Sequence, residues 1–283
     1  MTALILDGNN LAIRSHLAPK GEMSAAGMDT GTLVLFVNTL ARYVKIERPT
    51  HGLVAWDSGY SAYRTHIFPE YKANRKQKYS DDINVPFQLL HQFLYLSGFP
   101  QLQLPGYEGD DIIYASWRAC RARRQIRIVS SDKDLFQLVG NGTEQIRLTS
   151  NHEKPDRWDR TRIITDLGYK PEHAVSVMAL MGDKSDGIPG LPRVGPKTAI
   201  KMLRECEWDL DRLLDKLPAE QQERVLVNLA LVDLSLVPLE LDEPPELHLV
   251  SPGHPAWPKL IEFCEIYELN QIKSKLENNT LWE

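Results

Sequence analysis

Short apolar runs alternate with segments of helical periodicity along the first 150 residues. The runs lie at 3–7 (ALILD), 51–57 (HGLVAWD), 101–104, 125–130 and 144–150. Between them, residues 30–47, 85–97 and 110–122 carry apolar side chains at helical spacing. Alternating strands and helices indicate an α/β fold, in which a mostly parallel sheet is covered by helices on both faces.

Strand patterns stop near residue 160, and the rest of the chain shows mainly helical patterns. These lie at 171–182, 196–205, 208–216, 219–234 and 257–277, with a Pro-rich linker at 238–247. We therefore predict two parts, an α/β core over residues 1–160 and a mainly helical part over residues 161–283.

Composition is that of an ordinary globular protein, with 42% apolar and 25% charged residues among 283. No apolar run approaches the roughly 20 residues that span a bilayer, and the N-terminal MTALILDGNN lacks the features of a signal peptide. The three cysteines are far apart, which predicts neither a disulfide framework nor a zinc cluster. We expect a soluble, cytoplasmic monomer without membrane contact.

Acidic residues gather where the predicted strands end. The carboxyl ends of parallel strands meet at one edge of an open sheet, and such sheets bind their ligands there. Two further acids stand one helical turn apart after the helix at 171–182, and they would join the others if the helical part packs over that edge. The nine residues are Asp7, Asp57, Glu108, Asp110, Asp111, Asp132, Asp134, Asp183 and Asp186.

So many carboxylates at one place repel one another. Two unit charges about 4 Å apart repel by roughly 4 kcal/mol at an effective dielectric constant near 20, so the group requires bound cations or protonation of several members. Oxygen ligands without His or Cys suit Mg²⁺ or Mn²⁺ rather than Zn²⁺, and more than three or four carboxylates suggest two ions. Taken singly, Asp132 could be a helix cap and Asp110 and Asp111 first-turn acids, but capping does not explain the whole set.

A basic segment with interleaved aromatic residues, YKANRKQKYS, lies at 71–80. Cations that follow a nucleic-acid backbone, with rings on which bases stack, are typical of a single-strand-binding groove; the alternative is a solvated loop with a few buried aromatics. The net charge of −5 does not oppose a polyanionic partner, because setting the nine acids aside leaves 29 acids against 33 Lys and Arg. The residues concerned are Tyr71, Lys72, Arg75, Lys76 and Lys78.

The stretch GIPGLPRVGPKTA at 187–199 predicts a tight turn between two helices. Its glycines Gly187, Gly190 and Gly195 allow a close approach of the backbone to a ligand. The free amides at the start of the second helix, with Lys197 beside them, can hold a phosphate without reading a base.

With these motifs assembled, the sequence closely resembles the 5′-nuclease superfamily, which includes bacteriophage 5′-exonucleases, flap endonucleases and the 5′-nuclease domain of bacterial DNA polymerases. The motifs that carry the resemblance are LDGNNL, FPEYKANR, GYEGDD, SSDKDLFQL and MGDKSDGIPGLPRVGPKTA, in family order between residues 4 and 199. The resemblance implies a PIN-like nuclease core with a helical arch at about 65–98 and a helix-hairpin-helix at about 171–206.

The resemblance also implies roles for individual residues. Ligands of a first metal site would be Asp7, Asp57, Glu108, Asp110 and Asp111. A second site or its outer shell would comprise Asp132, Asp134, Asp183 and Asp186. Catalytic residues would be Lys72 and Arg75 at the base of the arch, together with Asp7 and Asp111. DNA-binding residues would be Tyr71, Lys76, Lys78, Gly190, Arg193, Gly195, Lys197 and Thr198. Many relatives carry a basic residue at the position of Thr198. A K⁺ ion would join the hairpin to a phosphate.

The implied activity is that of a structure-specific 5′-nuclease, a flap endonuclease and 5′→3′ exonuclease that hydrolyses DNA by a two-metal mechanism in replication or repair. Its substrates would be 5′-flap, nicked or branched duplexes, with two Mg²⁺ ions that Mn²⁺ can replace. Three alternatives stay open. They are a phosphotransferase of the haloacid-dehalogenase type, which needs a second Asp where Asn9 stands, a topoisomerase-primase type site at Asp132 and Asp134, and a DNA-junction-binding protein with an inert site.

Overall fold

A six-stranded sheet forms the centre of the computed structural model, which describes residues 1–18, 28, 30–73, 83–149 and 155–283. The strands are β1 (Thr2–Asp7), β2 (His51–Trp56), β3 (Gln101–Gln103), β4 (Gln125–Val129), β5 (Thr143–Arg147) and β6 (Asp156–Trp158). Their order in the sheet is β3-β2-β1-β4-β5-β6. Neighbouring strands pair in parallel, except that β6 runs antiparallel to β5. The predicted fold class is therefore correct, with one short antiparallel edge strand that the sequence did not reveal.

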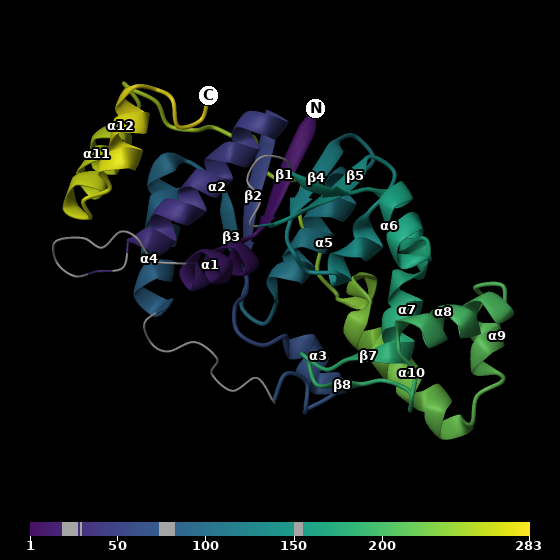
Figure 1. Cartoon of the computed structure of the whole chain (residues 1–283). Helices are drawn as coiled ribbons and strands as arrows, with labels where there is room; N and C mark the ends of the chain where they lie inside the picture. Colours follow the sequence, from purple (N-terminus) through teal and green to yellow (C-terminus); the bar gives the residue numbers. More distant parts are fainter. Residues whose placement is uncertain (19–27, 29, 74–82, 150–154) are drawn as a thin grey trace.

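Helices cover both faces of the sheet (Figure 1). On one face lie α1 (Gly8–Leu17), α2 (Gly31–Glu47) and α4 (Asn84–Ser97), and on the other lies α5 (Gly109–Cys120). Leu4 and Leu6 of β1 join the apolar cluster with α2 and α4, whereas Ala3 and Ile5 join the cluster with α5. Successive strand residues point to opposite faces, so the uninterrupted apolar run of β1 requires helices on both faces of the sheet.

The hairpin region has an apolar cluster of its own, formed by α7 (Ala174–Met181), α8 (Pro196–Glu205), α9 (Leu210–Leu214) and α10 (Ala219–Val232). The turn between α7 and α8 contains two short antiparallel strands, β7 (Gly182–Asp183) and β8 (Ile188–Pro189). Two helices joined by a tight turn thus occupy the segment predicted as a helix-hairpin-helix.

The α/β core extends past the predicted boundary at residue 160. The helix α6 (Arg160–Leu167) packs through Ile163 against Phe136 and Trp158, which belong to the core. Of the arch predicted at about 65–98, α4 is a core helix, and residues 74–82 lie outside the described residues.

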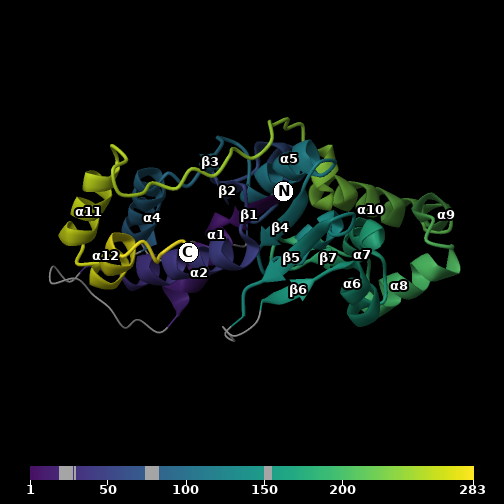
Figure 2. The same cartoon turned by 90° about the horizontal axis from the view of Figure 1, so that it is seen from above.

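Residues 245–283 also pack on the α/β core and not with the hairpin. Beside β2, the Gly52 amide donates to the Pro245 carbonyl and the Leu247 amide to the Thr50 carbonyl. The helices α11 (Trp257–Ile266) and α12 (Asn270–Glu277) then join the cluster around α2 and α4, at the opposite end of the molecule from α8 and α9 (Figure 2). The prediction of a single helical part over 161–283 fails here, because helical periodicity identifies an apolar face but not the surface that it covers.

Among the described residues, no helix combines the length and the apolar character needed to cross a membrane.

Phe263→Ala tests whether α11 belongs to the core. Phe263 is 2% exposed and packs on Phe93, with ring centroids 6.1 Å apart. Its truncation should lower the free energy of unfolding by about 3–5 kcal/mol, measured by urea denaturation followed by circular dichroism. Ile266→Ala, on the same helix but 64% exposed, should change this free energy by less than about 0.5 kcal/mol. Equal effects of the two substitutions would mean that α11 only rests on the surface.

Candidate active site

The carboxyl ends of β1, β2 and β4 face a cavity of about 190 Å³. Parallel pairing places these strand ends at one edge of the sheet, and the start of α5 and the hairpin turn close the cavity from the sides. Seven of the nine predicted carboxylates line it, namely Asp7, Asp57, Glu108, Asp110, Asp132, Asp134 and Asp186.

Two asparagines at the start of α1 connect the strand ends around this cavity. Asn9 Oδ1 accepts a hydrogen bond from the Asp57 amide (2.9 Å), and Asn10 Oδ1 accepts one from the Ser131 amide (3.0 Å). Asp7 caps α1 by accepting from the Asn10 amide (2.9 Å), and its other oxygen accepts from the Ser130 hydroxyl (2.7 Å). The motif LDGNNL therefore fixes the ends of β1, β2 and β4 relative to one another, a role that the sequence analysis did not assign to Asn9 and Asn10.

A buried guanidinium that the sequence analysis missed forms one wall of the cavity. Arg64, on α3 (Ala62–Ile67), is 3% exposed. Its Nη1 donates to Glu108 Oε2 (3.0 Å), its Nη2 to Asp111 Oδ1 (2.8 Å) and its Nε to the Leu231 carbonyl (2.8 Å). No spacing rule distinguishes this Arg from a surface residue of a short helix, and its position just before FPEYKANR is the only signal that could have drawn attention to it.

Asp111, predicted as a metal ligand and a catalytic residue, does not line the cavity. Its carboxylate pairs with Arg64 and accepts from the Glu108 amide (2.9 Å), which completes a capping box at the start of α5. Adjacent helical residues point about 100° apart, so Asp110 faces the cavity and Asp111 turns away from it. In this structure Asp111 holds Arg64 and Glu108 in place.

Asp183 also lies outside the cavity lining. Burial acts to raise its pKa, but hydrogen bonds from Ser185 and the charge of Lys133 outweigh burial and lower it. The Ser185 amide donates to Asp183 Oδ1 (2.7 Å), and Lys133 Nζ lies 3.3 Å from Asp183 Oδ2. The structure therefore places Asp186 in the cavity lining and Asp183 just outside it, where the charge of Asp183 still raises the pKa values of Asp132 and Asp134.

The pKa values of four carboxyls are raised inside the cavity. Burial, followed by the charge of Asp57, raises the pKa of Asp7 to about 7. Burial, followed by the charge of Asp132, raises the pKa of Asp134 to about 8 and that of Asp110 well above its usual range. Burial is also the main cause of the raised pKa of Asp132. The cavity thus disfavours its own negative charge at neutral pH.

This donor set fits a hard divalent cation in its chemistry. All of its ligands are carboxylate oxygens, and Asp134 Oδ1 is buried without a hydrogen-bond partner among the described residues. Within those residues, no three acidic, His or Cys side chains already surround a common point as a complete metal site. A cation that binds here therefore has to draw several carboxylates together. No His or Cys side chain among the described residues that line the cavity competes with them as a ligand.

Tyr71 and Lys72 line the cavity beside Glu108. The Tyr71 hydroxyl donates to Glu108 Oε2 (3.0 Å), and the Lys72 ammonium pairs with Glu108 and lies 3.6 Å from Asp186 Oδ2. Burial, followed by the charge of Glu108, raises the pKa of Tyr71. Lys72 has a left-handed backbone with φ of 57°, and its amide donates to the Asp186 carbonyl (2.8 Å). This strained conformation connects the base of the predicted arch directly to the hairpin turn.

The predicted basic residues Arg75, Lys76 and Lys78 lie outside the described residues, and their roles stay predictions.

The hairpin presents its phosphate-binding candidates to solvent. Gly190 crosses the end of α7 so closely that a methyl group on it would lie 2.1 Å from the Met181 carbonyl oxygen, so the turn requires glycine there. Gly195 precedes α8, whose first residue is Pro196, and the amides of the first turn of a helix have no acceptor within that helix. The predicted DNA-binding side chains on this surface are exposed, namely Arg193, Lys197 and Thr198.

Comparison with known proteins agrees with this architecture. A family model described as 5′-3′ exonuclease, N-terminal resolvase-like domain, matches residues 2–168, and one described as 5′-3′ exonuclease, C-terminal SAM fold, matches residues 169–244. The chain belongs to the 5′-3′ exonuclease family. The predicted family, fold and nuclease class are thereby confirmed.

Three similar proteins illustrate the relationship. A 5′-3′ exonuclease of Aquifex aeolicus is 35% identical over 72% of this chain and 69% of its own length. The DNA polymerase I of Bacillus caldotenax is 32% identical over 87% of this chain, which spans only 29% of that polymerase. A crystal structure of the bacteriophage T5 D15 flap endonuclease, in a complex with DNA and metal ions, has a TM-score of 0.67 at 21% identity and covers 95% of this chain and 100% of its own.

Asp134→Asn tests the electrostatic strain of the cavity in this exonuclease-family protein. The pKa of Asp134 is about 8 in the folded state against an ordinary 3.8, so the folded state binds more protons than the unfolded state between these values. The free energy of unfolding of the metal-free protein therefore falls as the pH rises from about 4 to about 8, and the variant lacks this loss. Its stability relative to wild type should increase by roughly 1–3 kcal/mol across that window, measured by urea denaturation in EDTA.

Asp211→Asn, which removes an exposed charge on α9 outside the cavity, is the matched control and should not show this increase. A constant or decreasing difference for Asp134→Asn would show that this carboxylate serves capping or packing instead.

Proposed function

We propose that this protein is a divalent-metal-dependent, structure-specific 5′-nuclease that cuts DNA as a flap endonuclease and 5′→3′ exonuclease. The observation that carries the proposal is the junction between the carboxylate cavity and the hairpin, where the Lys72 amide donates to the Asp186 carbonyl (2.8 Å). Through it, a strongly acidic cavity and a surface suited to DNA phosphates lie directly side by side.

Two Mg²⁺ ions, which Mn²⁺ can replace, are the proposed metals. One would be held by Asp7, Asp57, Glu108 and Asp110, and the other by Asp132, Asp134 and Asp186, which all line the cavity. Bound there, the ions would polarise the scissile phosphodiester and lower the pKa of an attacking water. The metal ions and DNA named for the related bacteriophage T5 structure support this assignment, and a K⁺ ion at the hairpin is a further part of the proposal.

The protein's own residues position the substrate. The free amides at the start of α8, with the exposed Lys197, would hold duplex phosphates without reading bases. Arg64 and Asp111 keep Glu108 fixed, while the Lys72 ammonium stands at the cavity wall, where it can meet charge that develops on the phosphate. We propose 5′-flap, nicked or branched duplexes as substrates, for a cytoplasmic monomer that acts in replication or repair.

A cleavage assay tests the proposal directly. A 5′-flap duplex labelled at its 5′ end is incubated with the protein in Mg²⁺, in Ca²⁺ and in EDTA, and a small phosphate monoester is the control substrate. We expect cleavage near the junction in Mg²⁺ only, with a 5′-phosphate on the new end and no hydrolysis of the monoester. Binding without cleavage in both Mg²⁺ and Mn²⁺ would favour an inert junction-binding protein, and hydrolysis of the monoester would favour a phosphotransferase.

Lys72→Ala should reduce the rate of the chemical step more than the affinity for DNA. A cation already placed beside the cavity stabilises the charge that develops on the phosphate more than the ground state. The single-turnover rate at saturating protein should fall by about 10²–10³, the effect of losing one electrostatic donor, while the dissociation constant for flap DNA in Ca²⁺ changes only a few-fold.

Lys76→Ala and Lys78→Ala are the matched controls, because they remove the same charge further along the basic segment. They should weaken binding in a salt-dependent manner and leave the saturated rate near normal. A Lys72→Ala variant that loses affinity but cuts at the normal rate once bound would contradict the catalytic assignment.

A further inference from the structure

The C-terminal end of α10 contacts three functional parts of the molecule at once. Two of its last carbonyls, which have no partner within the helix, accept from side chains of other elements, and a side chain of α10 itself donates to the hairpin. One contact reaches the hairpin, one reaches the Arg64 wall of the cavity, and one reaches the 3₁₀ helix η2 (Asp134–Leu138).

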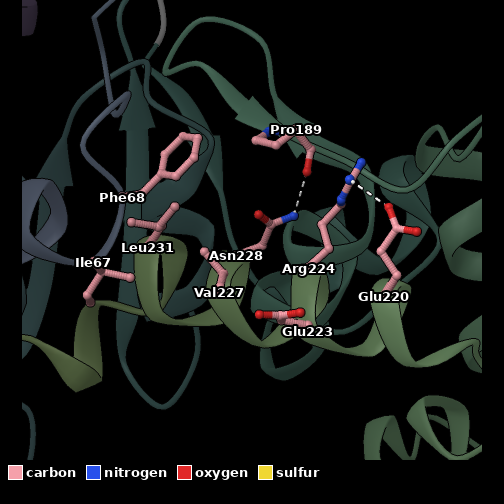
Figure 3. A pocket seen from close by; sticks show the side chains of 9 residues that line it. All are labelled: Ile67, Phe68, Pro189, Glu220, Glu223, Arg224, Val227, Asn228 and Leu231. Atoms are coloured by element: carbon pink, nitrogen blue, oxygen red, sulfur yellow. Dashed lines mark hydrogen bonds and ion pairs between the residues drawn. The ribbon is translucent and has the colours of Figure 1, made fainter.

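Asn228 makes the contact with the hairpin. It is 1% exposed, and its side-chain amide donates to the Ala179 carbonyl of α7 (2.8 Å) and to the Pro189 carbonyl of β8 (2.9 Å). Both sides of the hairpin turn are therefore held by one amide group, and Figure 3 shows the bond to Pro189. Making this pair of bonds requires a side chain with two donors on one nitrogen. Neither an ionised Asp nor a Leu at this position could make them.

The next turn of α10 makes the contacts with the cavity. Arg64, which holds Glu108 and Asp111, donates through Nε to the Leu231 carbonyl. Gln137 of η2 donates to the Val232 carbonyl (3.1 Å) and to the Asp134 carbonyl (2.8 Å), and it accepts from the Leu234 amide (3.1 Å). Carboxylates on both sides of the cavity are thus connected to the same helix end.

Apolar packing is close between α7 and α10, which share one buried cluster, but it is incomplete beside β8. A pocket of about 300 Å³ separates the end of α3, β8 and the exposed side of α10, with Phe68, Val227 and Leu231 on its walls (Figure 3). Since side chains do not fill this space, the bond from Asn228 to the Pro189 carbonyl has a larger share in fixing the β8 side of the hairpin turn than it would have in a close-packed interface.

We propose that Asn228 is a positioning residue that sets the distance from the hairpin to the carboxylate cavity, and through it the phosphodiester that is cut. The proposal rests on the nuclease function given above. Neighbouring phosphates of one DNA strand follow each other every 3.4 Å along the helix axis. A displacement of the hairpin by about one such step would bring the adjacent phosphodiester to the cavity without altering the hairpin's own phosphate contacts.

Asn228→Leu keeps the branched shape and the number of side-chain heavy atoms and removes both donors. On a flap duplex labelled at its 5′ end, incisions one nucleotide from the main position should increase about tenfold relative to the main cut, the effect of losing hydrogen bonds that favour one of two arrangements. The dissociation constant for the same DNA in Ca²⁺ should stay within a few-fold of wild type. Gln137→Met, a second variant that breaks the connection from η2, should displace the incisions in the same way.

Ile272→Ala is the control for lost stability, because Ile272 is buried in the core cluster with α2 and α4, away from α10. It should lower the melting temperature and leave the incision position unchanged. If Asn228→Leu and Gln137→Met behave like this control, with a lower melting temperature and the wild-type incision position, the positioning role is wrong. If wild-type protein does not cut the flap duplex at all, the proposed nuclease function fails, and this inference fails with it.

Discussion

Repulsion between carboxylates around one cavity is the constraint on which the arrangement of the site depends. Seven acidic side chains line a space of about 190 Å³, and burial with mutual repulsion raises the pKa of Asp7 to about 7 and of Asp134 to about 8. A fold tolerates such a site only where the surrounding structure is stable enough to hold it. Here the site lies between the α/β core and the hairpin cluster, each with its own buried apolar side chains.

Connections across the site are made by polar side chains with several partners each. Asn9 and Asn10 join the ends of β1, β2 and β4, and Arg64 joins α3, α5 and α10. Each of these groups satisfies a backbone atom or a carboxylate that would otherwise be buried without a partner. The same bonds that compensate for burial therefore also fix the positions of the acids.

The sequence was sufficient to predict the residues whose placement follows from topology. Asp7, Asp57 and Asp132 stand at strand ends, and parallel pairing alone brings them together. Residues whose role depends on the direction of a side chain were not predictable in this way. Asp110 and Asp111 are the same residue type at adjacent positions, yet the turn of the helix gives only Asp110 access to the cavity. The role of Arg64 and the packing of α11 on the α/β core were missed for a related reason, because a pattern within one segment does not identify its tertiary partner.

Positive side chains are distributed unevenly around the cavity, and this distribution determines which part of it attracts a metal ion most strongly. Glu108 pairs with Arg64 and Lys72, and Asp183 pairs with Lys133. Among the described residues, the four acids with raised pKa values form no such ion pair, and they are Asp7, Asp110, Asp132 and Asp134. Lys72 and Lys133 offset the repulsion among these four only in part, since the four pKa values stay raised, so a divalent ion next to them relieves the remainder. An ion next to Glu108 competes with two cations already in place. The protein's own cations therefore favour the side of the cavity formed by β1, β4 and the first turn of α5 as the first place for a metal to bind.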